Sequence, residues 1–253
     1  MQKTLIILVF IVLGVGCKHP SDKSEIPLKK ILFKAVHESG DWIESRHELT
    51  IFSDSTFVYN SKEKDHGHSK YEKFQGVVRI QNDTLYFSRK DMNGAGDQAV
   101  FKNDMLEFFD EAKMFRLAVT QNHTSLKSAL DLSAHSDYAL FSYYPSKKND
   151  YNKPYDLSQA EFDVVRSLIA CVFEENKDLR NPEAEFIKQL IPYRNRKGAI
   201  EVRVYLHSKN KLDPKGFKYH PIIGNNASIC SFSFVVFLTT NYYADLSAST
   251  ACK

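Results

Sequence analysis

The sequence predicts an α+β protein in two domains: an antiparallel, barrel-like β-meander, followed by one helix packed on a second antiparallel sheet. Three observations carry this prediction. Apolar and polar residues alternate between short turns over residues 28–145, which is the period of half-buried strands. A stretch after residue 157 repeats its apolar residues every three or four positions, as a helix does, and strand-like alternation then returns. The chain has 253 residues, 43% hydrophobic and 26% charged, which suits two globular domains.

The N-terminus begins with an apolar run over residues 5–13 that follows Lys3. The run is shorter than the roughly 20 residues that a membrane-spanning helix needs, but it suits the apolar region of a signal peptide. Cys17 follows directly after Gly16. This arrangement resembles the lipobox of bacterial lipoproteins, although Gly14 stands where an aliphatic residue is usual. The resemblance implies cleavage before Cys17 and diacylation of its sulfur.

Two other interpretations of this segment stay open: an ordinary secretory signal that is cut after Gly16, and an uncleaved anchor. The lipoprotein interpretation makes residues 1–16 a signal peptide and residues 17–27 a lipidated tether. It places the protein in the bacterial cell envelope, held on a membrane at its periplasmic or surface side, because two or three acyl chains give almost permanent anchoring.

The first domain, residues 28–145, reads as six to eight short antiparallel strands. Its clearest strand-and-turn patterns are Thr50–Phe57 and Ile80–Phe87, and its last strand is expected within Tyr138–Tyr144. A flat sheet would leave one apolar face in water, which favours closure into a barrel. The pattern resembles the small lipocalin-like domains of bacterial lipoproteins, and the resemblance implies a fold rather than a ligand.

The second domain, residues 157–253, follows a polar linker over residues 146–156 that has a proline near each end. Ser158 and Glu161 have the spacing of a capping box, so we expect a helix from about Ser158 to Glu175. Its apolar stripe comprises Phe162, Val165, Ile169 and Val172. Alternating strands follow near residues 200–207, 230–238 and 242–246. This order of elements resembles cystatin-like folds, but the inhibitor loop motifs of true cystatins are missing.

The cysteines after Cys17 offer one candidate disulfide, because an exported protein meets an oxidising compartment. If the last hairpin turns near Asn241, Cys230 and Cys252 come to lie nearly opposite each other. The alternative is that Cys230 is a small core residue and that Cys252 frays with the terminus. Cys171 would be a buried thiol on the helix.

His66 and His68 form an H-x-H pattern that could supply two imidazole ligands to a metal ion. The plainer interpretation is a charged hairpin loop, because the sequence shows no third ligand. We therefore expect no metal and no cofactor.

The stretch from residue 188 to 218 is rich in lysine and arginine, with tyrosines interleaved. A basic, aromatic surface suits an anionic headgroup or an acidic polysaccharide. The candidate anion-binding residues are Arg194, Arg196, Lys197, Arg203, Lys209 and Lys211. The alternative is a set of solvated loop charges, which salt screens over about 8 Å.

The motifs of common enzymes are missing: the sequence has no G-x-S-x-G, no P-loop and no H-E-x-x-H. The sequence therefore predicts a non-enzymatic binding module for an apolar or anionic ligand. The alternative is a structural component of the envelope that docks another protein, and a hydrolase of unrecognised type ranks third. Expected partners are the membrane, an envelope protein, a glycan or a small apolar ligand. A formal net charge of +3 is too small to favour nucleic acid.

Overall fold

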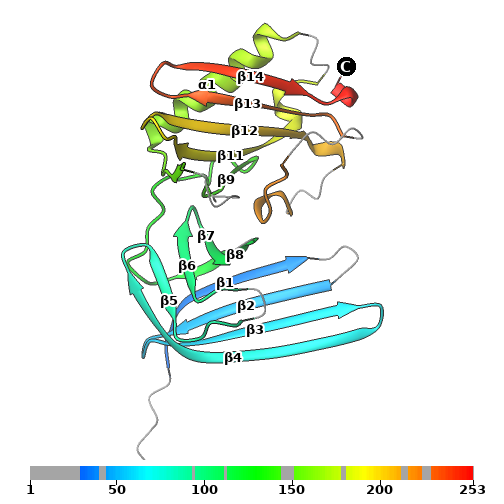
Figure 1. Ribbon diagram of the computed structural model, residues 1–253. Coiled ribbons are helices and arrows are strands. Elements are labelled where there is room, and N and C mark those ends of the chain that lie inside the picture. The colour runs from blue at the N-terminus through cyan, green and yellow to red at the C-terminus, as the bar shows by residue number, and fades with distance from the viewer. Residues whose placement is uncertain are drawn as a thin grey trace, which may run out of the picture.

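The computed structural model of the chain contains a closed antiparallel barrel and a second sheet that carries one α-helix, among the residues that it describes (Figure 1). The described residues are 29–39, 44–92, 95–110, 113–143, 151–177, 181–211, 216–223 and 229–252. The expected signal peptide and tether, with Cys17, lie outside them, and so does much of the expected linker. No helix in the described part of the chain is long and apolar enough to cross a membrane.

The barrel has eight strands, each paired with the next, and β1 pairs with β8 to close the ring. The strands are β1 (Ile31–Ser39), β2 (Glu44–Phe52), β3 (Thr56–Asp65), β4 (His68–Gln81), β5 (Thr84–Phe87), β6 (Gln98–Lys102), β7 (Met105–Asp110) and β8 (Lys113–Asn122). Tight turns at residues with positive φ, such as Ser55 and Asn82, reverse the chain between strands. The expected closed meander is therefore confirmed.

The inside of the barrel is filled by side chains. Large aromatic residues that are at most 6% exposed meet across it: the ring centres of Phe57 and Phe87 lie 5.1 Å apart, and those of Phe87 and Phe108 lie 5.6 Å apart. Eight strands enclose a space just wide enough for side chains to fill. The barrel interior is thus a packed hydrophobic core.

Gly76 allows the long strand β4 to pass close to the core. A Cβ atom at this position would contact the Ser88 hydroxyl and would lie 2.9 Å from Cε1 of Phe57. The residues beyond it, from Val78 on, leave β3 and pair with β5. A side chain here would push Phe57 out of the core, so the bend of β4 depends on glycine.

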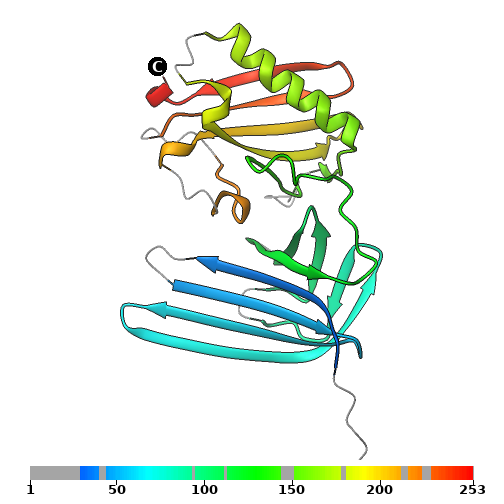
Figure 2. The same ribbon diagram turned by 180° about the vertical axis from the view of Figure 1, so that it is seen from behind.

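The second sheet has the order β10-β11-β12-β13-β14, and the short strand β9 pairs in parallel with β11. Its elements are β9 (Tyr138–Leu140), β10 (Lys153–Pro154), α1 (Gln159–Glu175), β11 (Phe186–Arg194), β12 (Ile200–Ser208), β13 (Ser231–Phe237) and β14 (Tyr242–Ala248), with the 3₁₀ turns η1 (Glu183–Glu185), η2 (Lys209–Lys211), η3 (Gly216–Lys218) and η4 (Thr250–Cys252). Figure 2 shows α1 lying across one face of this sheet.

The helix begins and packs as the sequence indicates. The Ser158 hydroxyl accepts a hydrogen bond from the Glu161 amide, and the Glu161 carboxylate accepts one from the Ser158 amide at 2.8 Å, which completes the capping box. All four residues of the apolar stripe are fully buried against the sheet: Phe162, Val165, Ile169 and Val172.

The strand expected at the end of the meander belongs to the other sheet, which corrects the predicted boundary at residue 145. β9 pairs with Lys188–Leu190, and β10, inside the expected linker, pairs with Tyr193 and Arg194. The chain thus changes from the barrel to the second sheet between Asn122 and Tyr138. Alternation along a segment indicates a strand but not its partner, and a parallel partner needs a long crossover, which here contains α1.

Candidate functional site

A group of arginines and tyrosines lies where the β11–β12 hairpin turns. Asn195 shapes this turn, because its side-chain oxygen accepts hydrogen bonds from the Lys197 amide at 2.9 Å and the Ala199 amide at 3.0 Å. Gly198 then takes a φ of +85°, which glycine adopts without strain. The turn therefore presents the end of the hairpin in one defined shape.

We call this group the arginine–tyrosine cluster, and each of its arginines has its guanidinium over at least one tyrosine ring. The distances from guanidinium carbon to ring centre are 5.2 Å for Arg194 over Tyr155, 5.0 Å for Arg196 over Tyr151, 5.0 Å for Arg203 over Tyr193 and 5.6 Å for Arg203 over Tyr143. Such stacking holds a guanidinium plane in place while its N–H groups remain able to donate hydrogen bonds.

The cluster keeps its positive charge. Glu201, the nearest carboxylate on the hairpin, accepts hydrogen bonds from the hydroxyl of Tyr193 at 2.6 Å and from the side-chain amide of Asn195. Burial, together with this bond, raises the pKa of Tyr193 to about 12. Within the described ranges, neither Arg194 nor Arg203 forms an ion pair. Arg194 donates one hydrogen bond to the Gly198 carbonyl at 2.8 Å, and its charge helps to lower the pKa of Glu161. The remaining N–H groups of the guanidiniums can receive an external anion.

The structure does not bring all six expected anion-binding residues together. Arg194, Arg196, Lys197 and Arg203 lie toward one end of β12, whereas Lys209 follows its other end and donates to the Ala184 carbonyl at 2.6 Å. The side chain of Lys211 lies outside the described part of the chain. A strand of nine residues spans roughly 30 Å, well beyond the Debye length of about 8 Å. Lys209 therefore lies apart from the other described members of this candidate set.

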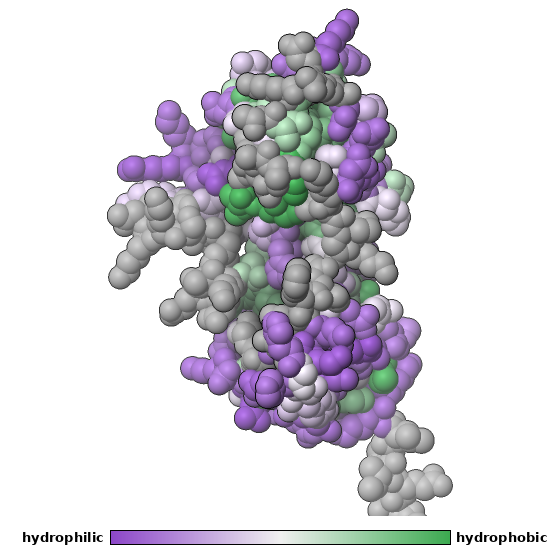
Figure 3. Space-filling view, turned by 90° about the vertical axis from the view of Figure 1, so that its right-hand side faces the viewer, coloured by the Kyte–Doolittle hydropathy of each residue, from purple (hydrophilic) through white to green (hydrophobic). Residues whose placement is uncertain are grey.

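The cluster borders the sheet face that α1 leaves uncovered. Tyr193, Glu201, Phe237 and Tyr242 lie directly opposite one another across four strands, and their side chains project from this face. Phe237 is half-buried, and Tyr242 is 59% exposed. The second sheet, α1 and the segments packed on them form the second unit. Seen from the end of the strands opposite the β11–β12 turn, this unit shows a hydrophobic patch above a largely hydrophilic barrel (Figure 3).

A second feature, the junction between the barrel and the second sheet, was not predicted from the sequence. Its centre is a buried ion pair between Glu107 of β7 and Arg116 of β8, with an N–O distance of 3.0 Å and exposed fractions of 0% and 1%. Arg116 also donates to the carbonyls of Leu140 at 2.8 Å and Lys218 at 2.5 Å, and its guanidinium lies 4.2 Å from the ring centre of Phe141. One barrel arginine thus joins two segments of the second unit.

A second ion pair crosses the same junction. The ammonium group of Lys102, on β6, lies 2.5 Å from the carboxylate of Asp156 and 3.4 Å from the hydroxyl of Ser142. Lys102 is 7% exposed. The contact between barrel and sheet is therefore rich in charged and polar groups, and it depends on their pairing.

Histidines line one side of the junction. The Nδ1–H of His37 donates to the Arg116 carbonyl at 3.1 Å, and its ring centre lies 4.3 Å from that of Tyr219 and 5.6 Å from that of His220. Burial, with the nearby His220 and His47 adding to it, lowers the pKa of His37 to about 4. Burial also lowers the pKa of His47. At neutral pH these imidazoles are uncharged.

A pocket of about 250 Å³ opens at the junction. Asn103, Met105 and Arg116 line it from the barrel side, whereas Tyr138 and Lys218 line it from the other side. Pockets at interfaces between domains are common ligand sites. The side chains of Arg116 and Lys218 reach this pocket from opposite sides. They would be separated if the junction opened.

The two histidines of the H-x-H pattern lie at the β3–β4 turn. His66 and Gly67 have φ angles of +44° and +88°, which fit a two-residue hairpin turn, and His68 begins β4. Within the described residues, no group of three or more histidine, cysteine or acidic side chains is placed to hold a metal ion.

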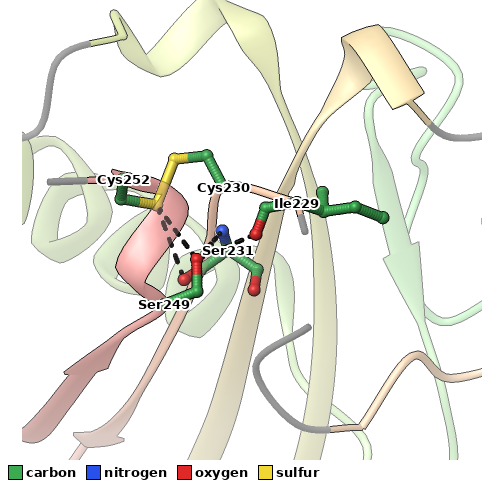
Figure 4. Close-up of a disulfide and its surroundings, with 5 residues drawn as sticks. All are labelled: Ile229, Cys230, Ser231, Ser249 and Cys252. Carbon is green, nitrogen blue, oxygen red and sulfur yellow. Dashed lines mark hydrogen bonds between the residues drawn. A yellow bond between two sulfur atoms is a disulfide. The ribbon is translucent and has the colours of Figure 1, made fainter. Parts of the chain in front are cut away.

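The candidate disulfide is present: Cys230 and Cys252 are bonded, with their Cα atoms 4.5 Å apart (Figure 4). Cys230 lies just before β13 and Cys252 lies in η4, so the bond joins the two ends of the last hairpin rather than two paired strand positions. The Ser249 hydroxyl beside it donates to the Ile229 carbonyl at 2.8 Å and accepts from the Ser231 amide at 3.0 Å. The end of the chain is thereby fixed to the second sheet.

Comparisons of the chain with models of known protein families, with curated proteins and with solved structures gave no match.

Proposed function

We propose that this protein is a lipid-anchored binding module of the bacterial cell envelope that holds an anionic ligand on the arginine–tyrosine cluster. The observation that carries the proposal is the set of guanidinium groups stacked on tyrosine rings, with no ion pair from Arg194 or Arg203 to a carboxylate of the described residues. Guanidinium groups match carboxylate and phosphate oxygens with paired N–H donors. An acidic polysaccharide or a lipid headgroup offers these oxygens.

The packed barrel favours an anionic ligand over an apolar one. Its interior is occupied by core side chains such as Phe57, Phe87 and Phe108. A small apolar ligand would have to displace them, which costs several kcal/mol per large side chain. The outer surface of the second unit is therefore the better supported place for binding.

The proposed activity is binding without catalysis. Arginine and tyrosine change their protonation far from neutral pH, and Tyr193 is moved further away, with a pKa of about 12. General acid–base chemistry works best with groups that titrate near the operating pH. The cluster is thus suited to hold charge in place rather than to move protons.

We propose a lipocalin-like barrel and a cystatin-like second unit as the closest fold descriptions. The closed eight-stranded meander supports the first of these, and the helix followed by antiparallel strands supports the second. β9, which precedes the helix and pairs in parallel, departs from the second description.

The anchor can be tested by fractionation. Replacing Cys17 by serine removes the thiol that would carry the acyl chains, so the protein should move from the detergent phase and the membrane fraction to the soluble fraction. Replacing Cys171 by serine, which leaves the N-terminus intact, should change nothing. Membrane partitioning that survives Cys17→Ser would contradict the lipid anchor.

The anion site can be tested by titrating the full chain, held in neutral detergent micelles, with two probes. Polygalacturonate represents an acidic polysaccharide, and micelles doped with phosphatidylglycerol represent a headgroup. We expect binding of at least one probe at low salt and its decline as salt rises. The combined change of Arg194, Arg196 and Arg203 to glutamine should weaken that binding by about tenfold, which is about 1.4 kcal/mol.

The matched control removes three positive charges elsewhere. Lys62, Lys64 and Lys70 are exposed on the β3–β4 hairpin of the barrel, and their combined change to glutamine should alter affinity less than about twofold. An equal loss in both triple variants would mean that net charge alone is responsible. That result, or no binding of either probe at low salt, would refute the proposed site.

A second candidate function is docking of another envelope protein. The observation that favours it is the edge strand β14, on which Tyr242 and Leu246 are exposed at 59% and 36%. An edge strand offers unpaired backbone groups to a further strand. Purification of the protein from its own membrane with a stoichiometric partner, lost when Leu246 is replaced by lysine, would support this function over anion binding.

A further inference from the structure

We propose that the contact between the barrel and the segment 216–223 is a proton-operated latch: it is closed while His37, His47 and His220 are neutral and opens when they gain protons. This inference concerns the junction and goes beyond the proposed binding function. His37 and His47 lie directly opposite each other on β1 and β2.

Both histidines continue the inward-facing rows of their strands and are almost fully buried. His37 is 5% exposed and His47 is 6% exposed, and their ring centres lie 5.9 Å apart. Phe115 packs against both rings, at 5.4 Å and 4.9 Å between centres. Tyr219 covers His37 from the second unit. An imidazolium formed here would lose most of its hydration while the junction stays closed.

The groups around the histidines carry charges of both signs. Those of the barrel are Arg116 on β8, Glu107 on β7, and Tyr59 and Glu63 on β3, and those of the second unit are Lys218, Tyr219, His220 and His207. Glu107 is already paired with Arg116. Glu63 raises the pKa of His47, but burial outweighs it. A proton on His37 would be buried next to His220 and His47, both of which disfavour it.

His37 can take up a proton only at Nε2, because its Nδ1–H already donates to the Arg116 carbonyl. His220 responds in the same direction: partial burial and the charge of Arg116 lower its pKa. His207, which binds the Ile222 carbonyl through Nε2 at 3.1 Å, also has a pKa lowered by burial. His37 on the barrel and His220 on the segment thus favour the open state when protons are added, whereas His207 lies within the second unit and is not part of the latch.

The segment that carries Tyr219 and His220 is firmly held by the second sheet. The side chain of Gln189, on β11, donates to the carbonyls of Phe217 at 2.6 Å and His220 at 2.9 Å, and it accepts from the Ile222 amide at 2.7 Å. The segment therefore moves with the sheet, and opening of the latch separates the barrel from the second unit.

The direction of the pH effect follows from linkage. A histidine with a lowered pKa binds a proton more weakly in the closed state than in the open state, where exposure to water shifts its pKa back toward the ordinary value of about 6.5. The closed state keeps its full stability above about pH 6.5 and loses it as the pH falls toward 4, the value for His37. Opening would expose the Arg116–Glu107 pair and pull Lys218 away from the 250 Å³ pocket.

Hydrogen exchange of the full chain in neutral micelles tests the latch. After correction for the intrinsic effect of pH on exchange, peptides from β8 and from residues 216–223 should exchange about fivefold faster near pH 5 than near pH 7. Peptides from α1 should show no such change. His37→Gln, which keeps a donor toward Arg116 but cannot gain a proton, should remove most of the difference.

Two further variants keep the test decisive. His68→Gln, in the turn far along the β3–β4 hairpin, should leave the pH effect intact. If His37→Gln does not fold, His220→Gln on the second unit should reduce the pH effect instead. Equal corrected exchange of the unmodified protein at both pH values would overturn the proposal. A pH effect that persists in His37→Gln would also overturn it. If His37→Gln does not fold, a pH effect that persists in His220→Gln would do the same.

Discussion

Replacing Arg116 by methionine is expected to lower the free energy of unfolding by about 3–5 kcal/mol, because Glu107 would remain buried without its partner. The carbonyls of Leu140 and Lys218 would lose their shared donor as well. Urea denaturation followed by circular dichroism measures the change. We also expect the transition to broaden, since the barrel and the second unit would no longer unfold together.

Two controls separate the buried charge from the loss of the arginine itself. The double change of Glu107 to leucine and Arg116 to methionine removes both charges and should recover a large part of the stability. Arg166→Met breaks a surface ion pair with Asp163, and the side chains of Arg166 and Asp163 are 42% and 54% exposed. This change should lower the free energy of unfolding by less than about 1 kcal/mol. A cost below about 1 kcal/mol for Arg116→Met would show that the pair does not hold the junction.

Replacing both Cys230 and Cys252 by serine is expected to cost about 3 kcal/mol. The bond closes a loop with a sequence separation of 22 residues, and its main effect is to restrict the unfolded chain. Thermal and urea denaturation without reductant measure the loss. A reductant should destabilise the unmodified protein to a similar extent and should not affect the double variant.

The free thiol of Cys171 provides the matched control for the disulfide. It lies on α1 and is partly buried, so Cys171→Ser should change stability by less than about 1 kcal/mol. If the double cysteine variant were as stable as Cys171→Ser, the bond would contribute nothing to the folded state.

Local structure could be predicted because its determinants lie close together in the sequence. Ser158 and Glu161 set the start of the helix, and the stripe from Phe162 to Val172 set the face that it buries. The closed meander followed from strand alternation and turn residues. The pair Cys230–Cys252 followed from its place at the two ends of one hairpin.

Pairing between distant segments could not be predicted in this way. Tyr138–Leu140 has the pattern of a strand, but its partner Lys188–Leu190 follows after α1 and is chosen by the packing of the whole unit. The basic residues of the stretch 188–218 are close together in the sequence, which suggests a single surface. In the fold, β12 carries Lys209 to the end opposite Arg196.

Some residues of the junction are unusual in the sequence, because they are charged or ionisable residues in otherwise apolar strand patterns. Glu107 is a single acidic residue between buried Leu106 and Phe108, and Arg116 similarly precedes buried Leu117. A charged residue in an otherwise apolar strand needs a partner or a second surface that covers it. His37 continues the inward row of β1, which placed an ionisable group on the apolar face. The sequence could not show that these residues meet.

The position of β9 has a consequence for how the second unit can exist on its own. β11 is flanked on one side by β12 and on the other by β9 and β10, so its backbone is paired along both sides. A fragment that started after the polar stretch, at residue 157, would lack β9 and β10. One edge of β11, the most buried strand, would then expose unpaired backbone amides and carbonyls. Such a bare edge recruits other chains. The independently folding piece therefore has to begin upstream of Tyr138, and during synthesis β9 must wait unpaired until β11 has been made.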